Sequence, residues 1–305
     1  MPKQGWGQRA VLLLPYLWLT AFFLAPFVIV LKISLSQTAI AQPPYVPVLD
    51  LAAGWQGLQD FAARLSGEGY RLIVSDPIYL LSYGKSLEVA AVSTAILLLV
   101  GYPIAYGIAR SPRGLQPLLV MLVVLPFWTS FLIRVYAWIN ILQRDGLLND
   151  VLLRIHIVSA PVSWLASDTA IYIGVVYSYL PFMVLPLYAT LEKLDDQLLE
   201  AAADLGCTRM WAFWRVTLPL SLPGVAAGVL LCFIPIVGEF VIPDLLGGSQ
   251  TLMIGQTLWT EFFSNRDWPV ASAIAVALLG LLLVPIVIYQ RLQSRQLQEI
   301  GRAHV

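Results

Sequence analysis

Residues 89–109 read VAAVSTAILLLVGYPIAYGIA, an apolar run of 21 residues without a charged side chain. At a rise of 1.5 Å per residue, a helix of about 20 residues crosses the ~30 Å hydrocarbon core of a membrane. Across the chain 59% of the residues are hydrophobic and 12% are charged, whereas soluble domains carry about 25% charged residues. The sequence therefore predicts an all-α integral membrane protein, because backbone polar groups in lipid must be satisfied within each helix.

Working outward from this run, five further stretches are long and apolar enough to cross a membrane. The first lacks the small-x-small cleavage site of a signal peptide and is interpreted as a retained span. No repeat or low-complexity linker divides the chain, so a single transmembrane domain, 1–305, is expected. The expected spans are 11–33, 84–109, 117–140, 168–190, 221–243 and 268–290.

The positive side chains indicate how these spans are oriented. Arg110 and Arg113 flank a very short connection, and further Lys and Arg residues lie near both chain ends and in the 191–220 loop. Lys and Arg concentrate in cytoplasmic loops. Both termini and the 191–220 loop are therefore expected on the cytoplasmic side, and the spans are expected to contact membrane lipid.

The 191–220 loop contains a second, shorter pattern. Asp195 and Asp196 stand where carboxylates cap the start of a helix and suit its dipole, and Gly206 is a natural C-terminal stop. Such a helix can insert into a groove of another protein, or it can be an ordinary amphipathic surface helix. Its expected apolar face consists of Leu194, Leu198, Ala201, Ala202 and Leu205.

The order Glu200-Ala201-Ala202, Gly206, Val216 and Leu218-Pro219 resembles the EAA loop of binding-protein-dependent ABC importer permeases, although isoleucine is more usual than Val216. The match covers twenty residues with fixed spacing. It implies a type I ABC importer permease fold and coupling of this loop to a cytoplasmic ATPase dimer, which would bind ATP and Mg in place of this chain. The implied coupling residues are Glu200, Ala201, Ala202, Asp204 and Gly206.

Four further segments are similar to the putrescine/spermidine permeases of this family, and the likeness runs from about Tyr83 to Tyr289. This resemblance implies a pathway for polyamines (putrescine or spermidine) across the bacterial inner membrane. It also implies a second homologous permease subunit and a periplasmic polyamine-binding protein as partners. The same permease role for another small solute, such as an amino acid or another cation, is the alternative. The segments are Gly238–Gly248, Asn265–Pro269, Leu132–Trp138 and Pro181–Met183.

The fifth expected span carries an acidic residue, Glu239, and an ionisable side chain inside a membrane is a functional candidate by default. Pro243 cannot donate to the carbonyl of Glu239, which leaves that oxygen free for another donor. Gly238 and the Gly247–Gly248 pair further predict a broken helix of the kind that lines a cavity. Glu239 either contacts or gates the substrate, or it forms a buried ion pair with Arg134 of the third span.

Aromatic rings in the third and fourth spans are the other candidates for a cation pathway. They attract ammonium groups by about 0.5–2 kcal/mol, but Trp and Tyr also form belts at membrane surfaces. Trp128 and Tyr177 lie deeper in their spans and are the better pore candidates, whereas Tyr136 and Trp138 fit a belt. Tyr179 is a further ring of the fourth span, and Asp244 is either a pathway residue or an interfacial acid. The predicted substrate pathway consists of Glu239, Asp244, Trp128, Tyr177 and Tyr136.

Other functions find little support in the residues. Gly84-Lys85-Ser86 matches the end of a nucleotide-binding P-loop, but position 79 is Tyr and the segment enters a span. The two cysteines and two histidines have no metal-ligand spacing, and 18 basic against 18 acidic residues create no field for nucleic acid. A transport subunit without its own cofactor or metal is expected. A membrane enzyme would need more intramembrane ionisable residues, and a sensor or scaffold would not need the Gly206 loop.

Overall fold

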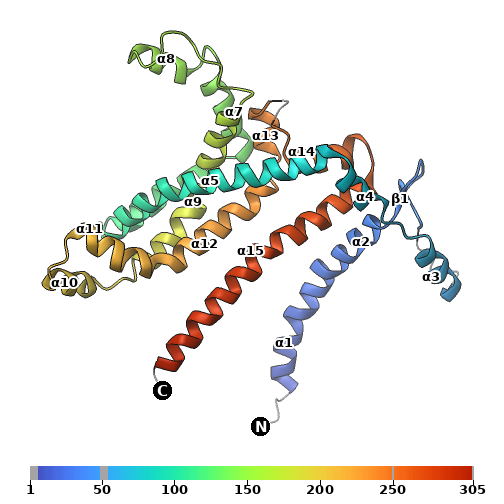
Figure 1. Ribbon diagram of the computed structural model, residues 1–305, viewed down its shortest axis with the longest axis horizontal. Helices are drawn as coiled ribbons and strands as arrows, with labels where there is room; N and C mark the ends of the chain where they lie inside the picture. The colour runs from blue at the N-terminus through green and yellow to red at the C-terminus, as the bar shows by residue number, and fades with distance from the viewer. Residues whose placement is uncertain (1–5, 49–53, 249–250, 304–305) are drawn as a thin grey trace. The chain divides into compact units, whose positions relative to one another are not determined.

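Helices form almost all the regular structure of residues 6–48, 54–248 and 251–303, which the computed structural model describes (Figure 1). Within these residues, five helices are individually long and apolar enough to span a membrane. A sixth span arises only if a pair of helices bent by 88° is counted as one crossing. The all-α fold with about six spans is therefore confirmed. The continuous spans are Leu13–Ser34, Pro77–Ala109, Asp168–Leu191, Arg209–Val237 and Trp268–Ile288, and the bent pair is Gln116–Trp128 with Phe131–Arg154.

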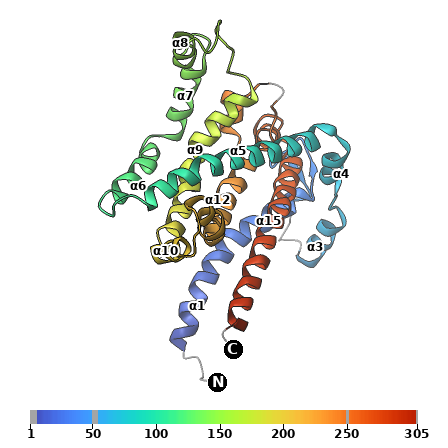
Figure 2. The ribbon, with the colours of Figure 1, turned by 60° about the vertical axis from the view of Figure 1, so that its left-hand side comes forward.

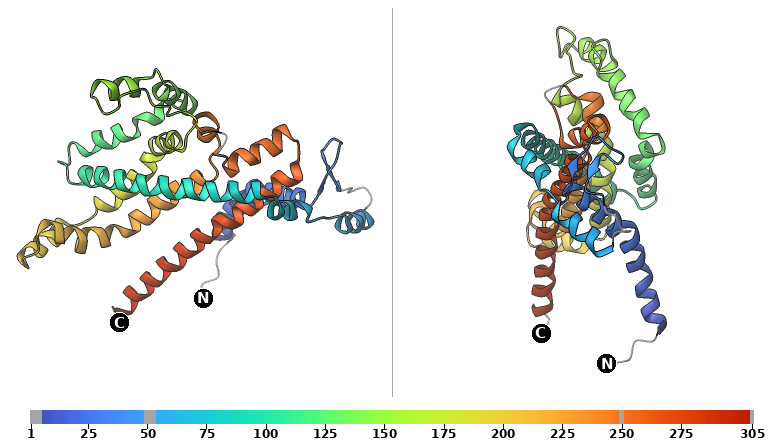
Figure 3. Two further views of the ribbon diagram at one scale, coloured as in Figure 1. Left: turned by 45° about the horizontal axis from the view of Figure 1, so that its top comes forward. Right: turned by 90° about the vertical axis from the view of Figure 1, so that its right-hand side faces the viewer.

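One compact unit contains the described parts of Met1–Leu81 and Thr257–Leu281. The first span buries 0% of its most apolar stretch within the chain, so lipid or a partner must cover it. After this span two strands pair antiparallel as a short hairpin, with Thr38 opposite Tyr45 (Figure 3). The elements are α1 (Trp6–Leu19), the π-helix η1 (Thr20–Leu24), α2 (Ala25–Ser34), β1 (Gln37–Thr38), β2 (Tyr45–Val46), α3 (Gly54–Ala63), α4 (Glu68–Ser75), the start of α5 (Pro77–Ala109), the end of α14 (Ile254–Trp259), the π-helix η4 (Thr260–Ser264) and the start of α15 (Trp268–Ala303).

The second compact unit contains the described parts of Ser82–Gln256 and Leu282–Val305. The expectation of one domain, 1–305, stays a prediction, and each unit is described by itself. Besides the remainder of α5, α14 and α15, the elements are α6 (Gln116–Val124), the 3-10 turn η2 (Leu125–Trp128), α7 (Phe131–Leu142), α8 (Leu147–Arg154), α9 (Asp168–Leu191), α10 (Asp196–Asp204), α11 (Arg209–Ala212), the π-helix η3 (Phe213–Thr217), α12 (Leu218–Val237) and α13 (Val241–Leu246).

Helices α9 and α12 pack side by side through glycines in this second unit, and Gly101 of α5 contacts α9 (Figure 1). A Cβ on Gly228 of α12 would lie 2.8 Å from Sδ of Met183 in α9, and one on Gly101 of α5 would lie 2.9 Å from Cγ of the same Met183. Gly224 of α12 approaches α9 in the same way, because its Cβ would lie 2.8 Å from Cβ of Thr190. Gly224 and Gly228 are four residues apart, the small-xxx-small spacing that lets helix backbones approach in a membrane.

The third expected span, 117–140, is not one continuous helix. Helix α6 passes into η2, and α7 then starts in a different direction (Figure 2). Thr129 has extended backbone with ψ of 152°, which ends the helical hydrogen-bond ladder. Its hydroxyl donates to the carbonyl of Pro126 at 2.8 Å, which closes the last turn. The prediction of an unbroken third span was therefore wrong.

The fifth expected span, 221–243, also ends earlier than the apolar run. Helix α12 stops at Val237, and α13 begins at Val241 after three non-helical residues. The predicted break at Gly238 is confirmed, and the predicted helix end at residue 243 is corrected to Val237.

Candidate functional site

The loop between α9 and α12 contains α10, and both ends of this helix are closed by nearby groups. A backbone N–H of the first turn donates to Oδ1 of Asp195 at 3.0 Å, which is the predicted cap. At the other end Gly206 has a φ of +81°. The N–H groups of Cys207 and Gly206 donate to the carbonyls of Ala202 and Ala203 at 3.0 and 2.9 Å. This Schellman motif requires a left-handed residue, so the predicted stop at Gly206 is confirmed.

The apolar residues of α10 do not form a single buried face. Ala202 is buried and Leu199 is half-buried against the unit, whereas Leu198 is 47% and Leu205 85% exposed. The apolar side chains extend farther around α10 than the part of the helix that packs against the rest of the unit. Part of the predicted apolar face is therefore exposed. The remaining implied coupling residues are also exposed: Glu200, Ala201 and Asp204.

The exposed apolar surface continues into α11 and η3. Met210, Trp211 and Trp214 are 67%, 56% and 58% exposed, and the guanidinium of Arg215 lies 4.9 Å from the ring centroid of Trp211. Large apolar side chains that gather on a surface mark contact with another protein or with a membrane. The loop from α10 to η3 is therefore built as a contact surface.

The segment Gly84-Lys85-Ser86 lies inside α5 and its polar groups are engaged within the chain. Nζ of Lys85 donates to Asp168 Oδ2 at 2.7 Å and lies 3.3 Å from Glu88 Oε1, and Oγ of Ser86 accepts from the N–H of Ile254 at 2.9 Å. A continuous helix offers no phosphate-binding loop here. Among the described residues, no group of three or more His, Cys, Asp or Glu side chains could hold a metal ion.

Glu239 lies in the break between α12 and α13, and its carboxylate is half-buried. Oε2 accepts from the hydroxyl of Tyr179 at 2.6 Å. Oε1 accepts from the N–H groups of Val241 and Ile242 at 3.1 and 3.4 Å, so Glu239 also caps the start of α13. The fourth and fifth spans thus meet at one carboxylate, which sequence reasoning did not pair with Tyr179.

Arg134 does not serve as the counter-ion of Glu239. Its guanidinium lies 4.9 Å from the ring centroid of Phe127 and 5.8 Å from that of Phe131. The side chain is buried, and its Nε and Nη1 have no hydrogen-bond partner among the described residues. The described side chains of Arg134 and Glu239 form no ion pair with each other. The buried ion pair, which was the alternative role for Glu239, is therefore not supported.

The carbonyl groups freed by the break point toward α14. A Cβ placed on Gly255 would lie 2.6 Å from the carbonyl oxygen of Gly238 and 2.7 Å from that of Glu239. Those distances are shorter than any real Cβ contact allows, so only glycine fits at position 255. The sequence carried no signal for this contact beyond a glycine near the start of a short helix.

The other predicted pathway residues are scattered over the second unit. Trp128 is 74% and Tyr136 54% exposed, and Asp244 is exposed on α13. Tyr177 is half-buried and packs edge-on against Trp138, with ring centroids 5.3 Å apart. Their contact with substrate stays a prediction.

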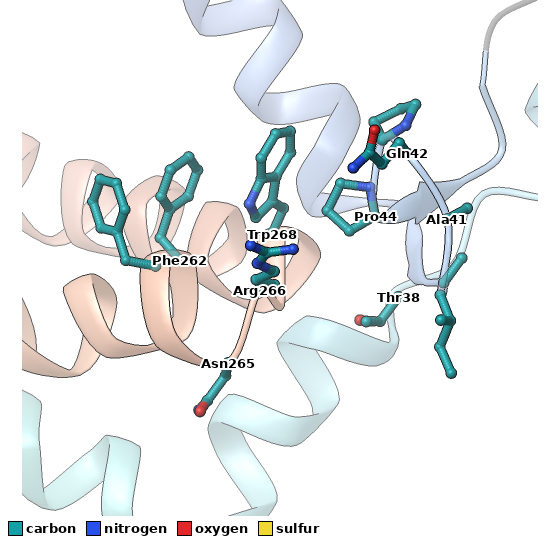
Figure 4. A pocket seen from close by; sticks show the side chains of 12 residues that line it. Thr38, Ala41, Gln42, Pro44, Phe262, Asn265, Arg266 and Trp268 are labelled. Carbon is teal, nitrogen blue, oxygen red and sulfur yellow. The ribbon is translucent and has the colours of Figure 1, made fainter.

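In the first unit, the β1–β2 hairpin and the chain between η4 and α15 enclose a pocket of about 740 Å³ (Figure 4). Trp268 stacks on Phe262 with ring centroids 5.2 Å apart, and Arg266 points into the same space. Thr38 donates to Asp267 Oδ1 at 2.7 Å, which fastens the hairpin to the start of α15. The pocket is lined both by residues of Asn265–Pro269, the segment that resembles polyamine permeases, and by the hairpin that follows the first span.

Comparison with known proteins agrees with these features. The chain is 38% identical over 284 residues to the spermidine/putrescine transport system permease protein PotB of Haemophilus influenzae, which covers 93% of each chain. It is 40% identical over 216 residues to PotB of Escherichia coli, which covers 71% of this chain and 78% of that protein.

The fold is also that of an importer permease. A chain of the bacterial alginate ABC transporter, solved in complex with alginate pentasaccharide-bound periplasmic protein, superposes with a TM-score of 0.73 at 16% identity. The match covers 95% of this chain and 94% of that chain, and the type I ABC importer permease fold is confirmed. Residues 8–298 match the family of binding-protein-dependent transport system inner membrane components. The protein is therefore a member of this family and a multi-pass permease subunit of the inner membrane.

Proposed function

We propose that this chain forms the pathway for polyamines, putrescine or spermidine, across the bacterial inner membrane as one subunit of an ATP-driven importer. The observation that carries this proposal is the 38% identity to a spermidine/putrescine permease over 93% of both chains. An identity that extends from end to end covers the pathway and the partner surfaces together. The proposal of a polyamine cargo therefore rests on sequence identity along the chain as well as on the shared fold.

The importer has three kinds of partner besides this chain. A cytoplasmic ATPase dimer binds ATP and Mg and docks on the exposed surface of α10, Met210 and Trp211. A second homologous permease subunit completes the pore, and lipid or this subunit covers the first span. A periplasmic polyamine-binding protein delivers the solute. Both termini lie in the cytoplasm, which places the α10 loop with the ATPase and the β1–β2 hairpin on the periplasmic side.

Transport follows alternating access without covalent chemistry in this chain. ATP binding closes the ATPase dimer and moves α10 through the coupling residues Glu200, Ala201, Ala202, Asp204 and Gly206. The spans then open toward the loaded binding protein, and hydrolysis resets them. Because α10 is closed at both ends by its own cap and Schellman motif, it moves as one rigid piece rather than unwinding under load.

A polyamine ammonium group binds the carboxylate of Glu239 beside the hydroxyl of Tyr179. Oε2 accepts one hydrogen bond from Tyr179, while a carboxylate oxygen has room for a second donor. The half-buried position leaves that oxygen within reach of a cation in the pathway. Other contacts along the route are Asp244, Trp128, Tyr136 and Tyr177, whose rings attract ammonium groups by about 0.5–2 kcal/mol.

The test is reconstitution of this chain with its partner subunits in liposomes, followed by uptake of radiolabelled putrescine and spermidine delivered by the binding protein. Polyamine uptake that requires ATP supports the proposal. Gly206→Asp serves as the matched variant, since it should abolish uptake while the complex still assembles. Uptake of an amino acid or another cation in place of polyamines would keep the permease role and refute the cargo.

A further inference from the structure

The contact between α10 and the spans is narrow. One hollow of about 860 Å³ lies beside it, lined among others by Arg110, Gln116, Lys193 and Asp196. A second hollow of about 410 Å³ also borders α10 and is lined among others by Arg110, Leu199 and Phe213. Close-packed interiors transmit displacement through every contact, but these hollows leave much of α10 without such contacts. Arg110 lines both hollows and therefore stands between them.

Arg110 joins the two elements directly. It follows the last residue of α5, and its Nη1 donates to Oδ1 of Asp196, the first residue of α10. The guanidinium also lies 5.6 Å from the ring centroid of Tyr106, one turn earlier in α5. The Arg110 side chain is 25% exposed and the Asp196 side chain 76% exposed. An ion pair this exposed contributes only about 0–1 kcal/mol to stability, so its geometry matters more than its energy.

The backbone on which Arg110 stands is held firmly. The side chain of Gln116 is buried, and its Nε2 donates to the carbonyls of Ala109 and Ser111 at 3.2 and 3.0 Å, on either side of Arg110. The hydroxyl of Tyr188 in α9 donates to Oε1 of the same Gln116 at 3.3 Å. A displacement that reaches Arg110 is therefore passed to α5 and α9 rather than absorbed by a loose turn.

A second route runs from Tyr106 into α12. Phe213, the first residue of the π-helix η3, packs edge-on against Tyr106 and Tyr102, with ring centroids 5.9 and 5.7 Å apart. The hydroxyl of Tyr102 lies 2.8 Å from Oγ of Ser221 in a buried hydrogen bond. Single turns of π-helix occur often at functional sites. The aromatic contacts thus connect the Arg110 region to the base of α12.

We propose that Arg110 is a positioning residue that passes the ATP-driven movement of α10 to the spans, through its ion pair with Asp196 and its contact with Tyr106, which packs against Phe213. This inference rests on the proposed function, in that it assumes an ATPase acting on α10. It assigns a role to a residue outside the EAA-like pattern. The link joins two segments separated by 86 positions in the chain.

The test is a charge exchange in the reconstituted complex, read as solute molecules imported per ATP hydrolysed. Arg110→Glu should lower this ratio at least fivefold while the complex still assembles and hydrolyses ATP. Asp196→Arg should have the same effect, and the double variant should recover at least half of the wild-type ratio. Arg113→Glu, an exposed arginine three residues away, is the matched control and should leave the ratio unchanged.

An unchanged ratio in Arg110→Glu would overturn the inference, and so would a double variant that stays as poor as the single ones. Loss of assembly in the single variants together with its return in the double variant, without any recovery of the ratio, would mean that the pair only stabilises the loop. The ratio is measured with whichever solute the wild-type complex imports. An importer of another solute would therefore refute the polyamine cargo while leaving this inference intact, and a complex that imports nothing would refute both.

Discussion

Gly206 offers a direct measurement of what the shape of the α10 loop contributes to transport. Its φ of +81° lies in the left-handed region, and a Cβ added there would meet no atom within 4 Å. The cost of Gly206→Ala is therefore purely that of the backbone conformation, about 1–2 kcal/mol. At about 1.4 kcal/mol per factor of ten, the closed Schellman turn should become roughly 5–30 times less favoured relative to an open one. We expect a clear fall in polyamine-stimulated ATP hydrolysis.

The matched control for this prediction is Gly206→Asn. Asparagine tolerates the left-handed conformation far better than alanine, and open space around the position accommodates its side chain. Stimulated hydrolysis should therefore rank glycine, asparagine, alanine, in falling order, while the amount of ATPase that co-purifies shows whether docking itself has changed. Equal activity of Gly206→Ala and wild type would refute the reasoning. A Gly206→Asn variant as weak as Gly206→Ala would mean that docking space, not conformation, selects glycine.

Three further changes test other parts of the structure. Glu239→Gln keeps the shape of the side chain but removes its charge. The loss of a charge-assisted contact of about 1.5–3 kcal/mol should reduce polyamine uptake about tenfold or more. Unchanged uptake would show that Glu239 is not a pathway residue. Gly255→Ala places a Cβ 2.6 Å from a backbone oxygen and should destabilise by about 1–3 kcal/mol, seen as a lower Tm in detergent; Gly280→Ala, in open space, should not lower it. Leu205→Glu changes a side chain that is 85% exposed, so Tm should stay constant while the ATPase no longer co-purifies, and normal co-purification would exclude Leu205 from the docking surface.

Composition and periodicity predicted the spans because lipid imposes one requirement on every crossing segment, a long apolar helix. They did not predict the break in the third span. The third span breaks at Thr129, where a hydroxyl closes a turn on Pro126, and the polar pair Thr129-Ser130 after Pro126 was not interpreted as a break. The break at Gly238 was predictable, since glycines and a proline gather around one acidic residue.

The α10 loop was predicted from local signals, because caps and a left-handed glycine act within a few residues. Contacts between distant segments were not predictable in the same way. The pairing of Tyr179 with Glu239 spans 60 positions, and each residue alone fits an interfacial belt or an ordinary buried acid equally well. Gly224 and Gly228 did carry a sequence signal, the small-xxx-small spacing, which identifies a close helix contact without naming its partner.

Three departures from ideal helices bear on the proposed transport cycle. Gly206 ends α10, Gly238 interrupts the fifth span beside Glu239, and Thr129 separates α6 from α7. Each break exposes backbone groups that need partners, and each finds them locally: the carbonyls of Ala202 and Ala203 at the first, Glu239 capping α13 at the second, and the Thr129 hydroxyl at the third. These partners lie in the same short stretch of chain as the break itself, so the helices beside each break end in defined caps. Two of these breaks, at Thr129 and Gly238, fall within otherwise apolar runs, and the one at Gly206 lies in the loop between α9 and α12. Under the proposed alternating access, these are the points at which neighbouring segments would turn relative to one another.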